Sequence, residues 1–170
     1  SLLLDDGQLS PFRFNNLIKL ALRLEKLQWA EDFIKEARDL LDPYHRSMYV
    51  HNAYCMLFFA KGHYEETLKH LQRVEYKDLF IALDSKVLLI KVYFHLDEYE
   101  VLENYISTVK KFLQRKDILA YHRDLYKSFV RMVQKLIRLS PYDQSAKQKL
   151  RKEIDETERL PERSWLLEQL

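Results

Sequence analysis

Glycine is nearly absent from this sequence, since only Gly7 and Gly62 occur among its 170 residues. A loop that binds phosphate through backbone amides needs clustered glycines, and the strained serine turn of α/β-hydrolases needs them too. Proline is also scarce, with four residues, and runs of β-branched residues are short. This composition favours long helices over sheets with tight turns. Because no motif fixes a pair of catalytic groups either, we predict an all-α protein that is not an enzyme and uses no cofactor.

Cysteine and long apolar runs are scarce as well. The single cysteine, Cys55, excludes an internal disulfide framework and fits a reducing compartment, so we expect a cytoplasmic protein with a buried, unreactive thiol. No apolar run approaches the ~20 residues of a membrane-spanning helix, and we expect no membrane insertion. The chain begins with Ser1 rather than methionine, which indicates an excised or processed chain. Charged residues make up 32% of the chain with a net charge of only +2, as on solvated helix faces.

Apolar residues make up 47% of the chain and recur with helical spacing in paired segments. After a loose lead-in over residues 1–9, Ser10 and Pro11 have the form of a helix start, with serine as the N-cap. We expect a break within the first pair at Gln28. We expect its second helix to end at Asp42, because a residue that precedes proline avoids helical geometry.

An aromatic residue recurs every 35 residues, at Trp29, Tyr64 and Tyr99. Each follows a break between two apolar patterns, and Gly62 can take the left-handed conformation that closes a helix. Self-similarity at such a period is typical of stacked helix pairs. We therefore predict that all three aromatic side chains are largely buried between the two helices of their pairs.

The pattern continues into a third pair and then changes. The second pair runs on to Val74, residues 76–78 connect it to the third, and Asp97 is expected at the turn of the third pair. Asp117 is suited to cap a longer helix over residues 118–139, where the 35-residue pattern is lost.

Residues 141–170 have a narrow apolar stripe and many charged residues. Ser140 and Pro141 repeat the serine–proline start, and Trp165 and Leu166 are available to dock back onto the preceding helices. A helix that is apolar on one narrow stripe fits the end of a helical array. We predict that this segment covers the last long helices with its charged side outward.

Residues 12–115 resemble tetratricopeptide repeats. The best match is to that family's turn and second helix, and it consists of Gly62, His63, Tyr64, Leu68 and Leu71. The stretch from Trp29 to Pro43 is also similar to bacterial proteins with such repeats. The chain departs from the family's small residues, with Leu20, Cys55 and Ile90 at its glycine position and Asp32, Thr67 and Leu102 at its alanine position.

The resemblance implies one domain over residues 1–170, built as a right-handed α-solenoid of antiparallel helix hairpins. The repeats fall at about 11–43, 44–78 and 79–116, followed by C-terminal capping helices over 117–170. In that family the inner faces of the first helices form a concave groove that binds peptides or partner proteins. The matching groove positions are Tyr49, Asn52, Met56, Phe59, Asp84, Val87, Lys91 and Phe94.

Two apparent sites of chemistry are better explained by chance. His63, Glu66 and His70 share one helix face with residue types that bind zinc, but no fourth ligand is indicated, so we predict no metal site. The sequence at 122–125, His-Arg-Asp-Leu, is similar to part of a kinase catalytic loop. Phe129 stands where the metal-binding asparagine of that loop is expected.

Five cations follow helical spacing in residues 118–139 and predict a basic stripe, which consists of Arg123, Lys127, Arg131, Lys135 and Arg138. One interpretation is a solvated face, partly neutralised by Asp155, Glu156 and Glu158. The other is a contact for an acidic partner or a nucleic acid. The isoelectric point of about 8.5 lies below the level typical of nucleic-acid-binding domains, so we expect a protein or peptide partner rather than a nucleic acid.

Three functions remain open on the sequence. The first is a non-catalytic scaffold that binds a protein or peptide in the concave groove. The second is a nucleic-acid-binding or regulatory helical domain that uses the basic stripe. The third is a structural oligomerisation module of a larger protein, which includes assembly as a homo-oligomer.

Overall fold

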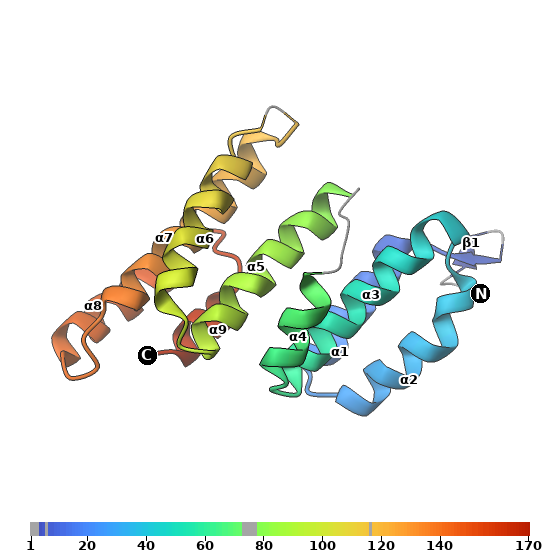
Figure 1. Cartoon of the computed structure of the whole chain (residues 1–170), viewed down its shortest axis with the longest axis horizontal. Coiled ribbons are helices and arrows are strands. Elements are labelled where there is room, and N and C mark those ends of the chain that lie inside the picture. Colours follow the sequence, from blue (N-terminus) through green and yellow to red (C-terminus); the bar gives the residue numbers. More distant parts are fainter. Residues whose placement is uncertain (1–3, 6, 73–77, 116) are drawn as a thin grey trace. The chain divides into compact units, whose positions relative to one another are not determined.

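The structure is a computed structural model that describes residues 4–5, 7–72, 78–115 and 117–170. The described residues are mostly helical, which confirms the predicted all-α class (Figure 1). No helix in this part of the chain combines the length and the apolar character that crossing a membrane requires. The chain divides into two compact units, Ser1–Glu98 and Tyr99–Leu170, called unit 1 and unit 2 below. The division falls between the two helices of the predicted third pair, and the single-domain organisation stays a prediction.

The described residues of unit 1 form two helix pairs and one further long helix. The first pair is α1 (Pro11–Arg23) and α2 (Leu27–Ala37), the second is α3 (Pro43–Ala60) and α4 (Tyr64–Leu71), and the last helix is α5 (Leu79–His95). A short 3₁₀ helix, η1 (Arg38–Leu40), leads from α2 to α3. The predicted apolar residue Val74 and the connector residues 76 and 77 lie outside the described part of the chain.

Proline and aspartate explain where the first helices of these pairs begin. Pro11 and Pro43 lie in the first turns of α1 and α3, where the missing amide hydrogen is not needed. Ser10 is the N-cap of α1, as predicted, although its side chain accepts no hydrogen bond. Asp42 begins α3 rather than ending α2, because its carboxylate accepts an amide of the first turn at 2.8 Å. Asp78 begins α5 in the same way, with two amides at 2.9 and 3.0 Å.

The three first helices end in the same backbone motif. Glu25, Gly62 and Asp97 take left-handed conformations, with φ of 56°, 76° and 57°. At each site the left-handed residue donates its amide to the carbonyl three residues back, and the next amide bonds five residues back, as in a Schellman motif. The bonded pairs are Glu25–Leu22 and Lys26–Ala21, Gly62–Phe59 and His63–Phe58, and Asp97–Phe94 and Glu98–Tyr93. The predicted breaks at Gly62 and Asp97 are confirmed.

The helix ends show that the predicted 35-residue period is wrong in its first interval. Glu25 and Gly62 are 37 residues apart, whereas Gly62 and Asp97 are 35 apart. The break in the first pair accordingly lies at Glu25 rather than Gln28, and α2 begins at Leu27. Trp29 therefore lies two positions deeper in its helix than Tyr64, which is the first residue of α4.

The prediction that the recurring aromatics are largely buried is wrong for Trp29 and Tyr99. Trp29 is 48% exposed and Tyr99 is 39% exposed, while Tyr64 is half-buried. The buried side of α2 consists of Ala30, Ile34 and Ala37. Trp29 lies beside that stripe and stacks on Phe33 instead, with 4.9 Å between ring centroids. Tyr99 is the first residue of its helix and precedes the buried stripe, which starts at Leu102.

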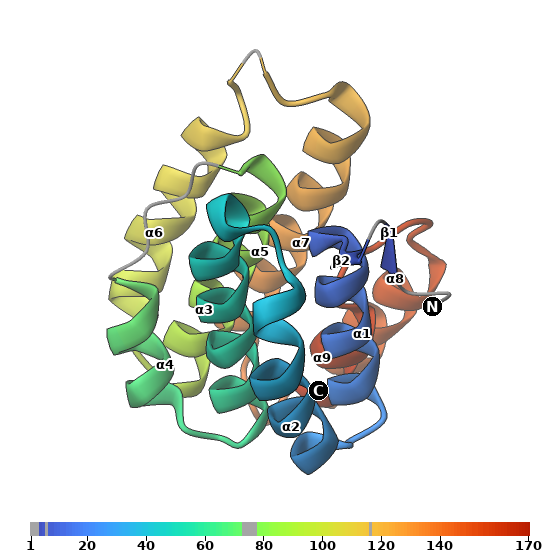
Figure 2. The ribbon, with the colours of Figure 1, turned by 90° about the vertical axis from the view of Figure 1, so that its right-hand side faces the viewer.

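The core of unit 1 lies between helices of neighbouring pairs. α3 packs against α1, α2, α4 and α5, and Figure 2 shows α1, α2 and α3 side by side. One buried cluster includes Phe14 and Ile18 of α1, Ile34 of α2 and Leu57 of α3. A second cluster includes Cys55 with Leu71, Leu88 and Val92. Cys55 has no exposed surface, and burial raises the pKa of its thiol to about 12, which confirms the predicted buried cysteine.

The lead-in to α1 is more ordered at its end than predicted. β1 (Leu4–Asp5) and β2 (Gln8–Leu9) pair as short antiparallel strands. Leu9 also bridges to Leu41 and is only 2% exposed, so it belongs to the core of unit 1. The prediction of a loose lead-in is therefore wrong at Leu9.

Unit 2 contains four helices in its described residues: α6 (Tyr99–Phe112), α7 (Ala120–Arg138), α8 (Gln144–Glu156) and α9 (Arg163–Glu168). Two predicted helix starts are wrong. Asp117 does not cap α7, because its carboxylate pairs with Arg115 at 2.6 Å. Asp143 rather than Ser140 is the N-cap of α8, and its carboxylate accepts the Ala146 amide at 2.9 Å.

The segment after Pro141 packs within unit 2 as predicted. α8 packs against α7 and α9, and the Trp165 ring lies 6.2 Å from the Phe129 ring. Trp165 is 6% exposed and Leu166 is fully buried, which confirms that both dock back. The role of this segment as the end of a repeat array stays a prediction.

Candidate partner-binding groove

The predicted groove residues come from two helices that pack against each other, α3 and α5. Their exposure divides them into two groups. Tyr49, Asn52 and Val87 are buried, with 8%, 1% and 8% of their surface exposed. The remaining five are half-buried and retain surface that a partner can reach, and they are Met56, Phe59, Asp84, Lys91 and Phe94.

Asn52 belongs to a buried polar chain that links α1, α3 and α5. Its Nδ2 donates to Oδ1 of Asn15 at 3.4 Å, and its Oδ1 accepts from Oγ of Ser85 at 3.4 Å. Asn15 and Ser85 are themselves 8% and 3% exposed. Buried polar groups are destabilising unless they are hydrogen-bonded. These three side chains therefore hold the three helices in one register, and Asn52 presents no surface to a partner.

Asp84 and Tyr49 extend this polar layer. Asp84 Oδ2 pairs with Lys19 Nζ at 2.6 Å and accepts from Asn15 Nδ2 at 3.3 Å. The Tyr49 hydroxyl donates to Asp78 Oδ2 at 3.4 Å. Burial, followed by the negative charge of Asp78, raises the pKa of Tyr49 to about 12, so the phenol remains a hydrogen-bond donor at neutral pH.

Phe59 lies at the centre of an aromatic cluster with Tyr64 and His95. The sequence assigned Phe59 to the groove but not Tyr64 or His95. Its ring centroid lies 5.3 Å from that of Tyr64, 5.5 Å from that of His95 and 4.7 Å from Lys91 Nζ. Tyr64 and His95 stack nearly in parallel, with centroids 4.5 Å apart. Burial, and then the charge of Lys91, lowers the pKa of His95, so the neutral imidazole is favoured.

The position of these residues relative to the helix ends is the signal that the sequence interpretation missed. Phe59 lies three residues before Gly62, Tyr64 two residues after it, and His95 two residues before Asp97. Aromatic residues beside neighbouring helix ends come together when the helices pack in register. The Schellman motifs therefore predict this cluster better than the aromatic period does.

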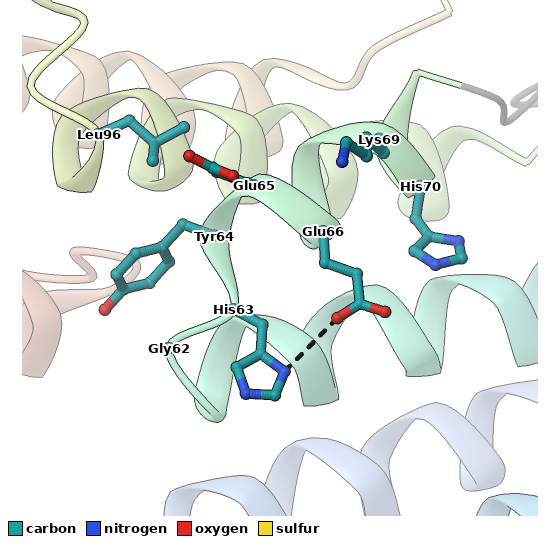
Figure 3. A pocket seen from close by; sticks show the side chains of 8 residues that line it. All are labelled: Gly62, His63, Tyr64, Glu65, Glu66, Lys69, His70 and Leu96. Atoms are coloured by element: carbon teal, nitrogen blue, oxygen red, sulfur yellow. Dashed lines mark ion pairs between the residues drawn. The ribbon is translucent and has the colours of Figure 1, made fainter.

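A surface depression of about 700 Å³ opens at the start of α4, next to this cluster. Its lining residues are Gly62, His63, Tyr64, Glu65, Glu66, Lys69, His70 and Leu96 (Figure 3). His63 Nδ1 lies 3.5 Å from Glu66 Oε2, and Tyr64 points away from that pair. The rings of His63 and His70 both stack on Phe58, with centroids 6.5 and 5.1 Å from it. In the described part of the chain, no group of three histidine, cysteine or acidic side chains is arranged to hold a metal ion.

The five residues of the predicted basic stripe all lie on α7, but they have different surroundings. Arg123 donates to three backbone carbonyls at 2.7 to 3.1 Å, those of Leu113, Arg115 and Ile118. Lys135 pairs with Glu153 at 2.6 Å, a partner that the prediction did not name. Lys127, Arg131 and Arg138 are exposed, with no ion pair or hydrogen bond to another described residue. Two members of the stripe thus have structural roles, and three are available to a partner.

The chain matches no family model, no curated protein and no solved structure. The resemblance to tetratricopeptide repeats therefore rests on the residues quoted above and stays a prediction. The partner-binding role of the groove residues likewise stays a prediction, to which the structure adds their positions, contacts and exposure.

Proposed function

We propose that this chain is a non-catalytic scaffold that binds an apolar protein segment on one face of α3 and α5. We call this the groove face and define it by Met56, Phe59, Lys91 and Phe94. The observation that carries the proposal is that these half-buried side chains come from two helices held together by the buried Asn15–Asn52–Ser85 chain. A rigid surface loses little conformational entropy when a partner binds, which favours recognition.

The proposal includes stacked hairpins in a right-handed, tetratricopeptide-like solenoid. Its support is the Schellman motif that recurs at Glu25, Gly62 and Asp97, together with the packing of α1 on α3 and of α3 on α5. Stacked hairpins place successive first helices side by side, and their shared face forms an extended binding surface. The groove face would be part of that surface.

A non-catalytic role is supported by the distribution of the perturbed titratable groups. Active sites bring such groups together, often in a cleft. Among the described residues, Glu31 pairs with Lys35 and Lys61, and the hydroxyl of Tyr49 bonds to Asp78. Cys55 is enclosed in the core, and His95 stacks on the Tyr64 ring. These groups have separate partners and do not converge on one reacting position.

The chemistry of the groove face favours a partner with apolar side chains. Phe59, Phe94 and Met56 offer aromatic and thioether surface, and Lys91 is close to the Phe59 ring. Aromatic anchors in well-packed surroundings contribute most of the energy at protein interfaces. Methionine adapts its shape to different partners. We therefore expect a short segment that inserts one or two large apolar side chains.

The proposal is tested with peptides selected from a random library against the full chain. The three methionines provide an internal readout once their methyl groups are labelled with ¹³C for NMR. A selected peptide should shift the methyl signal of Met56. It should leave Met48, eight residues earlier on α3, and Met132, buried in unit 2, nearly unchanged. A peptide that shifts Met132 and not Met56 would contradict the assignment of the site.

Two variants then locate the binding surface. Phe59→Ala should weaken peptide binding by about 30-fold or more, the effect of losing an interface anchor. The matched control is Tyr44→Ala, since Tyr44 is an aromatic residue of the same helix that is 77% exposed. Circular dichroism confirms that both variants are folded. Equal affinities in the two variants would refute the groove face as the site, and self-association that Phe59→Ala abolishes would favour the oligomerisation alternative.

A further inference from the structure

Positive charge is concentrated in one part of unit 2. Between Lys110 and Lys152 the sequence has thirteen lysines and arginines against three acidic residues. The rest of the chain has fifteen against twenty-three. The low net charge of the whole chain therefore hides a strongly basic segment that covers the end of α6, all of α7 and most of α8.

Part of this charge forms a continuous surface, which we call the cationic ridge and define by Lys110, Lys127, Arg131 and Arg138. Lys110 of α6 donates to Oε1 of Gln134 on α7 at 2.9 Å. Gln134 lies three residues after Arg131 and four before Arg138, so these side chains are neighbours on the helix surface. Lys127 precedes Arg131 by one helical turn. The three cations of α7 consequently follow one line along that helix, and Lys110 of α6 lies beside it.

Charged side chains dominate the exposed surface of α7 around the ridge. The residues of α7 between His122 and Arg138 that are exposed are all charged: Asp124, Lys127, Arg131, Lys135 and Arg138. Protein interfaces usually depend on apolar or aromatic anchors at their centre. From Lys127 to Arg138 the line is about 16 Å long at the helical rise of ~1.5 Å per residue, which exceeds the size of a single anion. The ligand that fits is a chain of repeated negative charges.

We propose that the cationic ridge binds the phosphate backbone of a nucleic acid. Arginine suits this ligand, because its planar guanidinium forms two parallel hydrogen bonds to phosphate oxygens. None of the four cations is paired with a carboxylate among the described residues, so binding breaks no ion pair there. Contacts to phosphates do not distinguish bases, and binding is therefore independent of sequence. The ridge belongs to unit 2, whereas the groove face belongs to unit 1.

The test measures binding of the full chain to a fluorescently labelled oligouridylate by anisotropy, with a labelled DNA duplex in parallel. Dissociation constants should fall in the range of about 10⁻⁴ to 10⁻⁶ M near physiological salt. For three or four phosphate contacts to a single strand, the logarithm of affinity should fall against the logarithm of salt with a slope of about −2 to −3. Absence of binding to both nucleic acids at about 50 mM salt would overturn the proposal.

Two charge-reversal variants distinguish binding at the ridge from a general effect of the chain's net charge. Arg131→Glu should weaken binding by about tenfold or more and reduce the salt slope by about one. Arg151→Glu is the matched control, because it makes the same charge change on an exposed residue of α8. Arg151 lies two residues before Glu153, which faces Lys135, so it points to the other side of α8. It should change affinity by less than about twofold.

A conservative variant and two competing ligands test further whether the ridge is a nucleic-acid site. Arg131→Lys should keep most of the affinity, since it preserves the charge. If Arg131→Glu and Arg151→Glu lose the same amount of affinity, the net charge of the chain alone determines binding. That result would overturn the ridge as a site. Polyglutamate that competes as well as unlabelled oligouridylate would assign the ridge to acidic proteins instead. Binding to anionic vesicles without binding to nucleic acid would assign it to a membrane surface.

Discussion

Substitutions at two left-handed residues, Gly62 and Glu25, should change the free energy of unfolding in opposite directions. Gly62 has φ of 76°, and a Cβ added there would meet no heavy atom within 4 Å. Gly62→Ala therefore causes no steric clash, and its effect comes from the backbone alone. A side chain in the left-handed region costs roughly 1–2 kcal/mol, and the smaller entropy of the unfolded alanine chain offsets about 0.4–1 kcal/mol of this. We expect a net destabilisation of about 1 kcal/mol.

Glu25 has φ of 56° in the same motif, so Glu25→Gly should act in the opposite direction. Removal of the strain should exceed the added entropy of the unfolded chain, which gives a stabilisation of about 0.5–1 kcal/mol. Glu25→Ala is the control, because it removes the carboxylate and keeps the strain. Urea midpoints at constant slope measure all three variants. If Glu25→Gly destabilises the protein as an ordinary glycine substitution in a helix does, the Schellman motif at the end of α1 is refuted.

Four further predictions follow from individual contacts. Asn52→Ala should destabilise the chain by about 2–4 kcal/mol in urea unfolding, since it leaves two buried partners short of a hydrogen bond; a change below about 0.5 kcal/mol would contradict the polar chain. Hydrogen bonds from two lysines hold the pKa of Glu31 at about 2. The stabilising contribution of this carboxylate is therefore present at neutral pH and is lost as the pH falls toward that value. NMR titration of the Glu31 carboxyl carbon measures its pKa, and an ordinary value would refute the prediction. The Cys55 thiol should react with a disulfide reagent only at the rate of unfolding, and rapid reaction in native buffer would contradict its burial. Trp165→Ala should lower stability by about 3–5 kcal/mol and Trp29→Ala by clearly less, because only the first ring is enclosed, so equal losses would count against the assigned positions.

Several helix ends of unit 1 were predictable because single residues determine where those helices start and stop. Pro11 and Pro43 fix the backbone at the first turn, and Gly62 takes a left-handed conformation at little cost. These effects depend on one residue and its immediate neighbours. The start of α8 was less predictable, since Ser140, Pro141 and Asp143 occur close together and only Asp143 caps the helix. At α7 the expected cap, Asp117, pairs with Arg115 instead.

The end of α1 could not be predicted in the same way. Glu25 carries no local preference for positive φ, and its conformation is stabilised by the two backbone hydrogen bonds of the Schellman motif. Those bonds form only when the helix has already ended at that residue. The aromatic at Trp29 therefore suggested a period that the backbone does not follow.

This error also concealed the polar chain beneath the candidate groove. A period of 35 places Leu17 opposite Asn52, which gives no reason to expect a buried hydrogen bond. The observed interval of 37 makes Asn15 and Asn52 equivalent positions, and their amides are in fact bonded. The family resemblance assigned Asn52 to partner binding because it falls at one of that family's groove positions. Its burial depends on a second asparagine that only the correct interval identifies.

Equivalent positions of α1, α3 and α5 have similar burial when they are counted back from the left-handed residue that ends each helix. Ile18, Cys55 and Ile90 have the same offset, and all three are fully buried. Two further rows are half-buried at every position, namely Leu22, Phe59 and Phe94, and Lys19, Met56 and Lys91. An apolar row thus runs beside a row with a lysine at each end. Lys19 already pairs with Asp84 at 2.6 Å, and Lys91 lies over the Phe59 ring. The apolar row of Leu22, Phe59 and Phe94 is therefore the part of this face that suits the apolar partner proposed above.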